Sequence, residues 1–329
     1  EQGHQLVVVV SAMGKTTNEL EDLARGANPD PPRRELDMLL SVGERITMSL
    51  LSMALAAEGC PAISFTGSQC GIITDTSHTD ARILEVRGDR VRAALAQDQT
   101  VVVAGFQGVS KEKEITTLGR GGSDTTAVAL ASALQAERCE IFKDVPGVMT
   151  ADPERVPAAR PHSQLSWDQL RRIAASGCGV VHMRAVEYAA KHEVPLVIKS
   201  SFEETEGTTV ACIADQPVAD RESRFRPLAM VVHEDLVRLG LATSDPDLAR
   251  RWRDLVLQNL DTAATVAEWL DSGQGFRWEI LAPGKVIAPV ARQLDRPGFS
   301  PEGSLVLQED LACISLAGGQ PDCWLEVER

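Results

Sequence analysis

The chain has 329 residues, enough for two domains, and its 43% hydrophobic and 24% charged residues exclude disordered and fibrous classes. The formal net charge of −14 argues against nucleic-acid and anionic-membrane partners, because polyanion binding relies on clustered Lys and Arg. No apolar run approaches the roughly 20 residues that span a bilayer, and the first residues lack the basic start and apolar core of a signal peptide, so we expect a cytoplasmic protein.

Apolar strand runs alternate with helical patterns along the first part of the chain. The patterns predict strands at 6–12, 61–67, 100–106 and 139–145, and helices at 17–26, 35–58, 90–97 and ending near 135. Such alternation is typical of an α/β fold in which helices cover both faces of a mostly parallel sheet. Ligands of these sheets bind beyond the carboxyl ends of the strands. The residues at those ends are Ser11, Gly67, Gly105 and Asp144.

A second domain is predicted after a polar stretch. The composition indicates a catalytic domain at 1–210, a linker at 211–226 and a smaller domain at 227–329. The smaller domain has an α+β pattern, with no catalytic cluster. Its predicted strands are 236–243, 276–281, 304–309, 311–318 and 323–328, and its predicted helices are 245–260 and 285–294.

Cysteine and histidine do not indicate a metal site. The seven cysteines are scattered without the close pairs that metal ligands form, so we interpret them as reduced thiols. His78 and His182 lie near the motifs described next, but a lone histidine is more often structural or on the surface.

The stretch ITTLGRGGSDTTAVAL, at 115–130, combines an arginine, glycines and small polar residues with the start of a helix. Ser123 or Asp124 capping the helix would account for the polar residues. The pair Gly121-Gly122 permits close approach of the backbone, and a helix N-terminus favours negative charge, which indicates an anion site. This stretch alone leaves both interpretations open.

Three further stretches are ambiguous when each is taken alone. SAMGKTT (11–17) ends like a phosphate-binding loop, but Val9 stands where that motif requires its first glycine. Its donors Ser11, Gly14 and Thr17 fit an ordinary turn equally well. Glu44 in SVGERIT alone would be a solvated helix carboxylate, and DVPGVMTADP (144–153) alone would be a surface turn.

Together, these stretches and VVHMRAVEYA (180–189) closely resemble the aspartate kinases of the amino-acid kinase family. The resemblance covers roughly residues 5–210, and TTLGRGGSDTTAVALA (116–131) is close to a family signature. It implies the amino-acid kinase fold and transfer of the γ-phosphoryl group of ATP, with Mg²⁺, to the β-carboxylate of L-aspartate. The product would be 4-phospho-L-aspartate, on the route to lysine, threonine and methionine.

The resemblance also assigns roles to residues. It implies that Arg120 grips the substrate α-carboxylate, for which its bidentate fork is suited, and that Glu44 faces the substrate ammonium. Arg120, Asp124 and Glu44 are the implied catalytic residues. The implied substrate pocket is completed by Ser11, Thr17, Ser123 and Asp124, and the implied nucleotide-binding residues are Lys143, Asp144, Met149, Asp152 and Pro153.

The sequence departs from the family pattern in its cations. The family's first strand carries Lys-Phe-Gly-Gly, which would precede Glu1, and we expect the printed chain without it to be a poor kinase. Gly179 stands where a lysine is frequent, and Glu154 where an arginine is common. Losing one preorganised donor costs about 2.7–4 kcal/mol of transition-state stabilisation. Lys143, where threonine is usual, adds a cation.

The second domain lies where the family carries paired ACT regulatory modules, but at about 100 residues it is short for two copies. Its amino-acid effector is left open, and we expect a homo-oligomer. Two alternatives also remain open. One is a catalytically weakened kinase-like regulatory protein that binds aspartate or nucleotide, and the other is a sister amino-acid kinase that acts on a different carboxylate.

Overall fold

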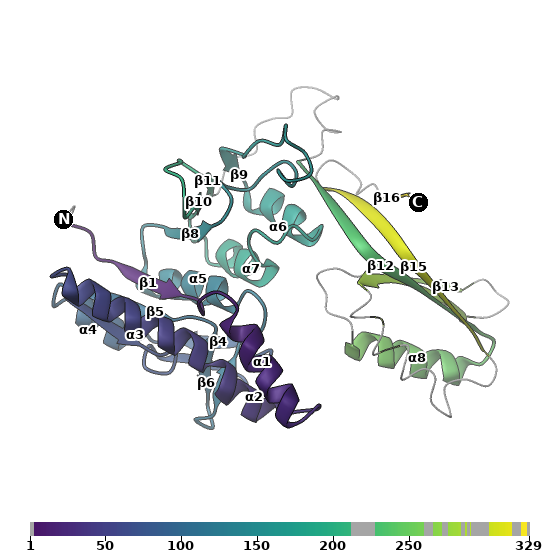
Figure 1. The fold of residues 1–329 in the computed structure, drawn as a ribbon, viewed down its shortest axis with the longest axis horizontal. Helices are drawn as coiled ribbons and strands as arrows, with labels where there is room; N and C mark the ends of the chain where they lie inside the picture. The colour runs from purple at the N-terminus through teal and green to yellow at the C-terminus, as the bar shows by residue number, and fades with distance from the viewer. Residues whose placement is uncertain are drawn as a thin grey trace. The chain divides into compact units, whose positions relative to one another are not determined.

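The computed structural model describes residues 3–211, 228–259, 266–271, 276–283, 287, 290, 303–317 and 324–327 (Figure 1). The chain forms two compact units. The N-terminal unit contains Glu1–Val148, Pro161–Arg171 and Gly179–Ala214, and the C-terminal unit contains Met149–Arg160, Arg172–Cys178 and Asp215–Arg329. All of the predicted linker except residue 211 lies outside the described residues, so the division at 211–226 stays a prediction.

A parallel three-stranded sheet forms the centre of the N-terminal unit. Its strands are β1 (Val7–Val10), β5 (Thr100–Ala104) and β2 (Ala62–Phe65), in the order β1-β5-β2. The run from Val101 to Ala104 is fully buried because helices cover the sheet on both faces. On one face, Met48 of α3 (Val42–Ala57) packs against Val102, and on the other, Leu130 of α5 (Gly122–Leu134) packs against Val101 and Val103.

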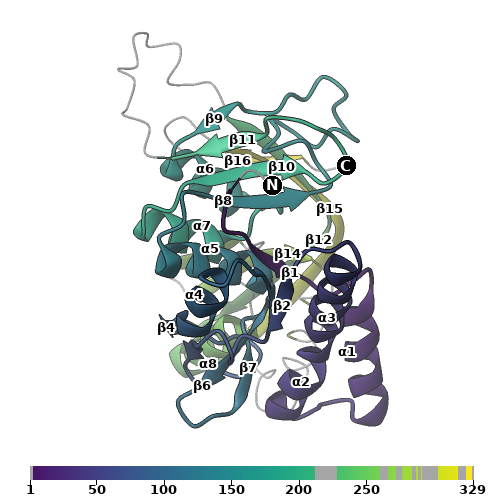
Figure 2. The same ribbon diagram turned by 90° about the vertical axis from the view of Figure 1, so that its left-hand side faces the viewer.

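Two mixed sheets extend this unit. One has the order β8-β10-β11-β9, from β8 (Cys139–Lys143), β10 (Leu196–Ser200), β11 (Thr208–Val210) and β9 (Gln164–Leu165). The other has the order β4-β3-β6-β7, from β4 (Ile83–Val86), β3 (Ile72–Thr74), β6 (Gln107–Ser110) and β7 (Ile115–Thr117). Figure 2 shows α5 beside α7 (Met183–Lys191), below β8. The remaining helices of this part of the chain are α1 (Thr16–Ala27), α2 (Arg33–Leu40), α4 (Asp89–Leu95) and α6 (Trp167–Ala175).

The single helix predicted at 35–58 is wrong, because α2 and α3 are separate helices that meet at Ser41. Ser41 is fully buried, and its carbonyl accepts a hydrogen bond from Gln107 Nε2 at 2.9 Å. Next to the break, a Cβ on Gly43 would lie 2.8 Å from Ala12 Cβ, so the chain here is fixed by packing. Helical periodicity carries no signal for such a break.

The stretch Arg33–Ala57, with a mean hydropathy of 1.3 over its most apolar window, is long and apolar enough to cross a membrane. The expectation that no run reaches that length therefore does not hold for this stretch. The evidence for a span is weak, because core helices pass the same test. Moreover, the stretch consists of two helices and contains the buried carboxylates of Asp37 and Glu44, which pair within the N-terminal unit.

The C-terminal unit has an antiparallel sheet in the order β13-β14-β12-β15-β16. Its elements are β12 (Ala229–Thr243), α8 (Pro246–Asn259), β13 (Val266–Asp271), β14 (Phe276–Pro283), β15 (Gly303–Ala317) and β16 (Trp324–Val327). This order of β12, α8, β13, β14 and β15 is ferredoxin-like, as expected for one ACT-like module. Leu248 and Trp252 of α8 pack on Leu239 and Ile280 of the sheet.

The structure of the C-terminal unit differs from the predicted elements in one strand, and it describes only part of one predicted helix. The strands predicted at 304–309 and 311–318 are the single strand β15, whose pairing with β12 contains register shifts. Such irregularities let one strand continue past a polar interruption, here at Glu309-Asp310. Most of the helix predicted at 285–294 lies outside the described residues, but Ile287 and Val290 have helical backbone and are buried.

Candidate active site

The ends of β1 and β5 lie side by side and meet the N-terminal end of α5. Gly105 N donates to Val10 O at 3.0 Å, which places the residues after both strands at one edge, as predicted for Ser11 and Gly105. A Cβ on Gly105 would lie 2.8 Å from Ser123 Oγ. The absence of a side chain at Gly105 therefore lets α5 bring Ser123 to this edge of the sheet.

The first turn of α1 joins the same edge. A Cβ on Gly43 would lie 3.7 Å from Thr16 Cγ2, so α1 begins close to α3, with Thr17 in its first turn. Ser11 is exposed, and Thr17 is partly buried. Lys15 is the N-cap residue of α1 and is exposed, without a side-chain capping bond. The structure therefore places Ser11 and Thr17 beside the helix that carries Glu44.

Glu44 is a buried carboxylate with one oxygen in use. Its Oε1 accepts a hydrogen bond from Ala12 N at 3.2 Å, whereas its buried Oε2 has no hydrogen-bond partner among the described residues. The residue is 3% exposed, and this burial raises the pKa of its carboxyl. The alternative of a solvated helix carboxylate is therefore wrong. A buried acceptor without a partner needs an explanation, and a ligand cation would supply one.

The loop that carries Arg120 is braced by neighbouring side chains. Gly119 and Gly121, on either side of Arg120, have φ of +72° and +66°, the left-handed region that glycine adopts without strain. A Cβ on Gly121 would lie 2.0 Å from His182 Cβ. Arg184 Nη1 donates to Leu118 O at 3.0 Å. The Arg120 side chain is exposed next to this fixed backbone.

Two interpretations of this stretch are corrected by the structure. The N-cap of α5 is Gly121, and no side chain makes a capping hydrogen bond, so neither Ser123 nor Asp124 caps the helix. The glycine pair does permit close approach, but the approaching groups are His182 at Gly121 and Phe106 at Gly122. The glycines therefore serve packing, and Arg120 is the cationic side chain of this loop.

A buried network that the sequence did not reveal supports the same loop. Asp37 of α2 is fully buried and accepts hydrogen bonds from His78 Nδ1 at 2.6 Å, from Thr79 N at 3.0 Å and from Thr117 Oγ1. In addition, Ala81 N donates to Thr117 O at 2.9 Å. Asp37 therefore ties α2 and the loop after β3 to the last residue of β7, three positions before Arg120. The position of His78 beside the motif was the only sequence signal.

Asp124 and Lys143 form an ion pair at the same end of α5. Lys143 Nζ lies 3.0 Å from both Oδ1 and Oδ2 of Asp124. The two side chains are 26% and 15% exposed, respectively. The predicted catalytic carboxylate and one predicted nucleotide-binding residue are thus brought together, from the start of α5 and the end of β8.

The other predicted nucleotide-binding residues are divided between the units. Asp144 follows β8 in the N-terminal unit and is exposed, whereas Met149, Asp152 and Pro153 belong to the C-terminal unit. Within that unit, Asp152 Oδ1 accepts a hydrogen bond from Glu154 N at 2.9 Å, in a turn. The structure therefore does not define one nucleotide site from all five residues.

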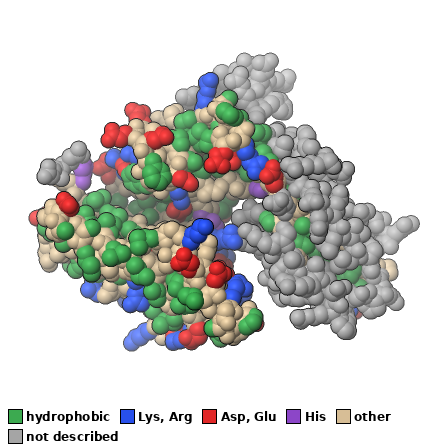
Figure 3. Space-filling view, in the orientation of Figure 1, with side chains coloured by type: hydrophobic (Ala, Val, Ile, Leu, Met, Phe, Trp, Pro, Cys, Tyr) green, Lys and Arg blue, Asp and Glu red, His purple; other side chains and the backbone are tan. Residues whose placement is uncertain are grey.

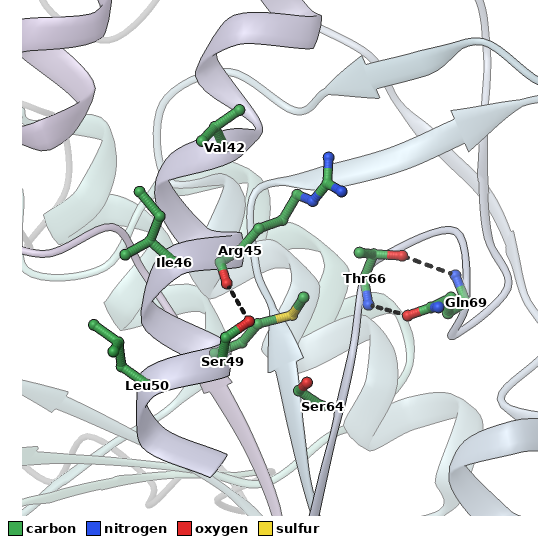
Figure 4. A pocket seen from close by; sticks show the side chains of 9 residues that line it. Val42, Arg45, Ile46, Ser49, Leu50, Ser64, Thr66 and Gln69 are labelled. Carbon is green, nitrogen blue, oxygen red and sulfur yellow. Dashed lines mark hydrogen bonds between the residues drawn. The ribbon is translucent and has the colours of Figure 1, made fainter. Parts of the chain in front are cut away.

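An open groove of about 720 Å³ lies beside α3 and is not lined by Glu44 (Figure 4). Arg45 and Ser49 of α3 line it together with Thr66 and Gln69 from the loop after β2. Leu50 and Met53, also on α3, are exposed apolar side chains. Figure 3 shows hydrophobic side chains where α3 lies in Figure 1. No predicted site residue lines the groove.

Titratable clusters add no second site. Among the residues that the structure describes, no group of three or more His, Cys, Asp or Glu is placed to hold a metal ion. Burial raises the pKa of both Cys70 and Cys139 to about 12, so both stay protonated and unreactive at neutral pH.

Sequence comparisons identify relatives that match from about two thirds to about four fifths of the chain. A profile of the amino acid kinase family matches residues 1–200. The aspartokinase of Bacillus sp. (strain MGA3) is 52% identical over 210 residues, which are 64% of this chain and 51% of that protein. The aspartokinase of Corynebacterium glutamicum is 47% identical over 272 residues, 79% of this chain and 64% of that protein. The chain thus spans about half the length of the first of these relatives.

Solved structures confirm the predicted fold. The crystal structure of aspartate kinase from Synechocystis matches 96% of this chain and 55% of that chain, with a TM-score of 0.57 and 37% identity. The crystal structure of E. coli aspartokinase III in complex with aspartate and ADP matches 92% of this chain and 68% of that chain, with a TM-score of 0.68. At 21% identity, this second match shows the shared fold alone.

Proposed function

Because the chain belongs to the amino acid kinase family, we propose that it transfers the γ-phosphoryl group of ATP to the β-carboxylate of L-aspartate. The observation that carries the proposal is the Oε2 of Glu44, a buried carboxylate oxygen without a hydrogen-bond partner among the described residues, at the strand edge that the Arg120 loop also reaches. A carboxylate and a guanidinium are well suited to hold the ammonium and the α-carboxylate of an amino acid. The 52% identity to an aspartokinase supports aspartate as the substrate.

In this proposal each group has a separate task. Arg120 binds the α-carboxylate through two parallel N–H donors, and Glu44 Oε2 accepts from the ammonium. Hydroxyl groups of Ser11, Thr17 and Ser123 complete the pocket at the ends of β1 and β5. These contacts leave the β-carboxylate directed at the nucleotide, so orientation of the substrate provides much of the rate enhancement over the uncatalysed reaction.

Of the predicted nucleotide-binding residues, Lys143 and Asp144 at the end of β8 would contact the nucleotide in the N-terminal unit, while the roles of Met149, Asp152 and Pro153 stay predictions. Because the described residues contain no cluster of metal ligands, the donor set fits Mg²⁺ held mainly by the phosphates of ATP. When bound, Mg²⁺ would neutralise charge on the phosphate oxygens.

The reaction requires no proton transfer. A β-carboxylate oxygen, already ionised at neutral pH, forms a bond to the γ-phosphorus while the bond from that phosphorus to the bridging oxygen breaks and ADP leaves. The protein therefore acts by positioning and by stabilising negative charge, as is general for phosphoryl transfer.

One observation favours the alternative of a weakened, kinase-like binding protein. Gly179 lies in a turn, with open space where a side chain would begin, so this position offers no cation to the nucleotide. Binding of aspartate or nucleotide without turnover would support that alternative. A sister kinase acting on another carboxylate, an amino-acid effector of the C-terminal unit and homo-oligomer formation remain predictions.

The test is a hydroxamate assay on the full chain, with ATP, Mg²⁺, hydroxylamine and either aspartate or glutamate, beside calorimetric titration with aspartate. We expect aspartyl hydroxamate to form and glutamate to react much more slowly. If aspartate binds in a way that depends on Glu44 and Arg120 but no product forms, the kinase proposal is rejected in favour of the weakened binding protein. Preferred turnover of glutamate would indicate the sister kinase.

A further inference from the structure

Lys143 occupies an unusual position for a lysine. It is the last residue of β8 and lies on the same sheet face as Cys139 and Ile141, which are 7% and 5% exposed. Its carbonyl accepts a hydrogen bond from Ser201 N at 2.7 Å, so its backbone is fixed. The ammonium is therefore held at the carboxyl end of the strand, on the face that packs against α5.

Asp124 orients this ammonium without using all of its donors. Both carboxylate oxygens lie 3.0 Å from Nζ, and no other side chain or carbonyl bonds to Nζ among the described residues. An ammonium has three N–H donors. The third donor is therefore available to an anion, while the pair as a whole is nearly neutral and stands at the N-terminal end of α5, where the helix dipole favours negative charge.

We propose that Lys143, positioned by Asp124, is the catalytic cation that contacts the transferring phosphoryl group. This rests on the proposed function and assigns a residue to its central step. As the β-carboxylate oxygen bonds to phosphorus and ADP leaves, Lys143 donates an N–H to a phosphoryl oxygen and stays protonated throughout. Stabilisation of this kind by one preorganised donor is worth about 10²–10³ in kcat.

Other cations near this edge are less suited to the task. Arg120 is assigned to the α-carboxylate in the proposed pocket. Lys15 is exposed at the start of α1, and its side chain makes no capping hydrogen bond there. Lys143 combines partial burial, a fixed backbone and a carboxylate that sets the direction of its ammonium toward the start of α5.

The chain provides a matched control in Lys199 of β10. Its side chain is also 26% exposed and also pairs with a carboxylate, Glu140, at 3.3 Å. Lys199 pairs in register with Phe142, the neighbour of Lys143, and so lies on the opposite face of the same sheet. Removing Lys199 tests the cost of losing a similar ion pair away from α5.

The experiment compares the full-length protein with Lys143→Thr, Lys199→Thr and Lys15→Met. In the hydroxamate assay we expect Lys143→Thr to lower kcat about 10²–10³-fold, with the aspartate KM within about twofold, while the two controls stay near the parent. A kcat near the parental value in Lys143→Thr would overturn the proposal. An equal loss in Lys199→Thr, or a larger loss in Lys15→Met, would overturn it as well.

A binding measurement separates this inference from the proposed function. The protein is titrated with ADP and Mg²⁺, first alone and then together with aspartate and aluminium fluoride. Aluminium fluoride imitates the transferring phosphoryl group. We expect Lys143→Thr to weaken the aluminium fluoride complex about 10²-fold more than it weakens ADP binding, and the ADP binding that is retained shows that the variant is folded. If the parent binds this complex without turning over aspartate, the kinase proposal fails while the role of Lys143 is still measured. Equal affinity of parent and variant for the complex would remove that role.

Discussion

Replacing Asp37 by Asn tests whether the buried network holds the Arg120 loop in place. Asn keeps one acceptor oxygen but presents an amide donor where the other oxygen stood, so one of the donors from His78, Thr79 and Thr117 is left without an acceptor. A buried unsatisfied donor costs about 1–3 kcal/mol, and loss of charge weakens each of the two remaining hydrogen bonds by about 1 kcal/mol. We therefore expect the free energy of unfolding to fall by about 3–5 kcal/mol.

The assay is urea denaturation at pH 7, with Thr117→Val as the matched variant. Thr117 is fully buried, and this change removes one donor while Asp37 keeps the other two, so we expect a smaller loss of about 1.5–3 kcal/mol. In the double variant, the losses should be less than additive because both changes weaken or remove the hydrogen bond between Thr117 and residue 37. Equal losses for the two single variants, or fully additive losses, would refute the reasoning.

Three further outcomes are expected. Because burial raises the pKa of Glu44 above its ordinary 4.5, its contribution to stability is complete below that pH and is lost as the pH rises through the raised pKa. Glu44→Gln should therefore unfold at a higher temperature than the parent at pH 7 but not near pH 4, and a difference independent of pH would contradict this. Arg120→Ala should raise the aspartate KM about 10–100-fold in the hydroxamate assay, with poor rescue by Arg120→Lys; an unchanged KM would remove the assignment. Gly121→Ala should lower the free energy of unfolding by about 2 kcal/mol or more, from its φ of +66° and the contact with His182, and denaturation like the parent's would show that the loop adapts.

Long apolar runs made the main elements of the N-terminal unit predictable. The run at 100–106 predicted a buried strand because a central parallel strand is apolar on both faces, and β5 is that strand. Short elements gave no such signal: β3 spans three residues, too few to show a period. The break at Ser41 was also missed, because it depends on a hydrogen bond from Gln107, a residue far along the chain.

The residues of the candidate site could be proposed from the sequence, but their arrangement could not. The motif around Arg120 identified the loop, yet the sequence could not show that His182 fills the space beside Gly121. The pairing of Lys143 with Asp124 depends on how β8 packs against α5, which is a property of the tertiary fold. Asp37 carried no local signal at all, since its partners come from two other segments.

The segment Met149–Arg160 depends on a strand that the ribosome makes much later. Thr150 O accepts a hydrogen bond from Met230 N of β12 at 2.8 Å, and Arg155 forms an ion pair with Glu234 at 2.8 Å. An N-terminal fragment that ends at residue 211 would keep this segment but lose both partners. Its backbone would then be open to proteases, and a domain boundary drawn along the sequence would divide a unit that is discontinuous in the chain.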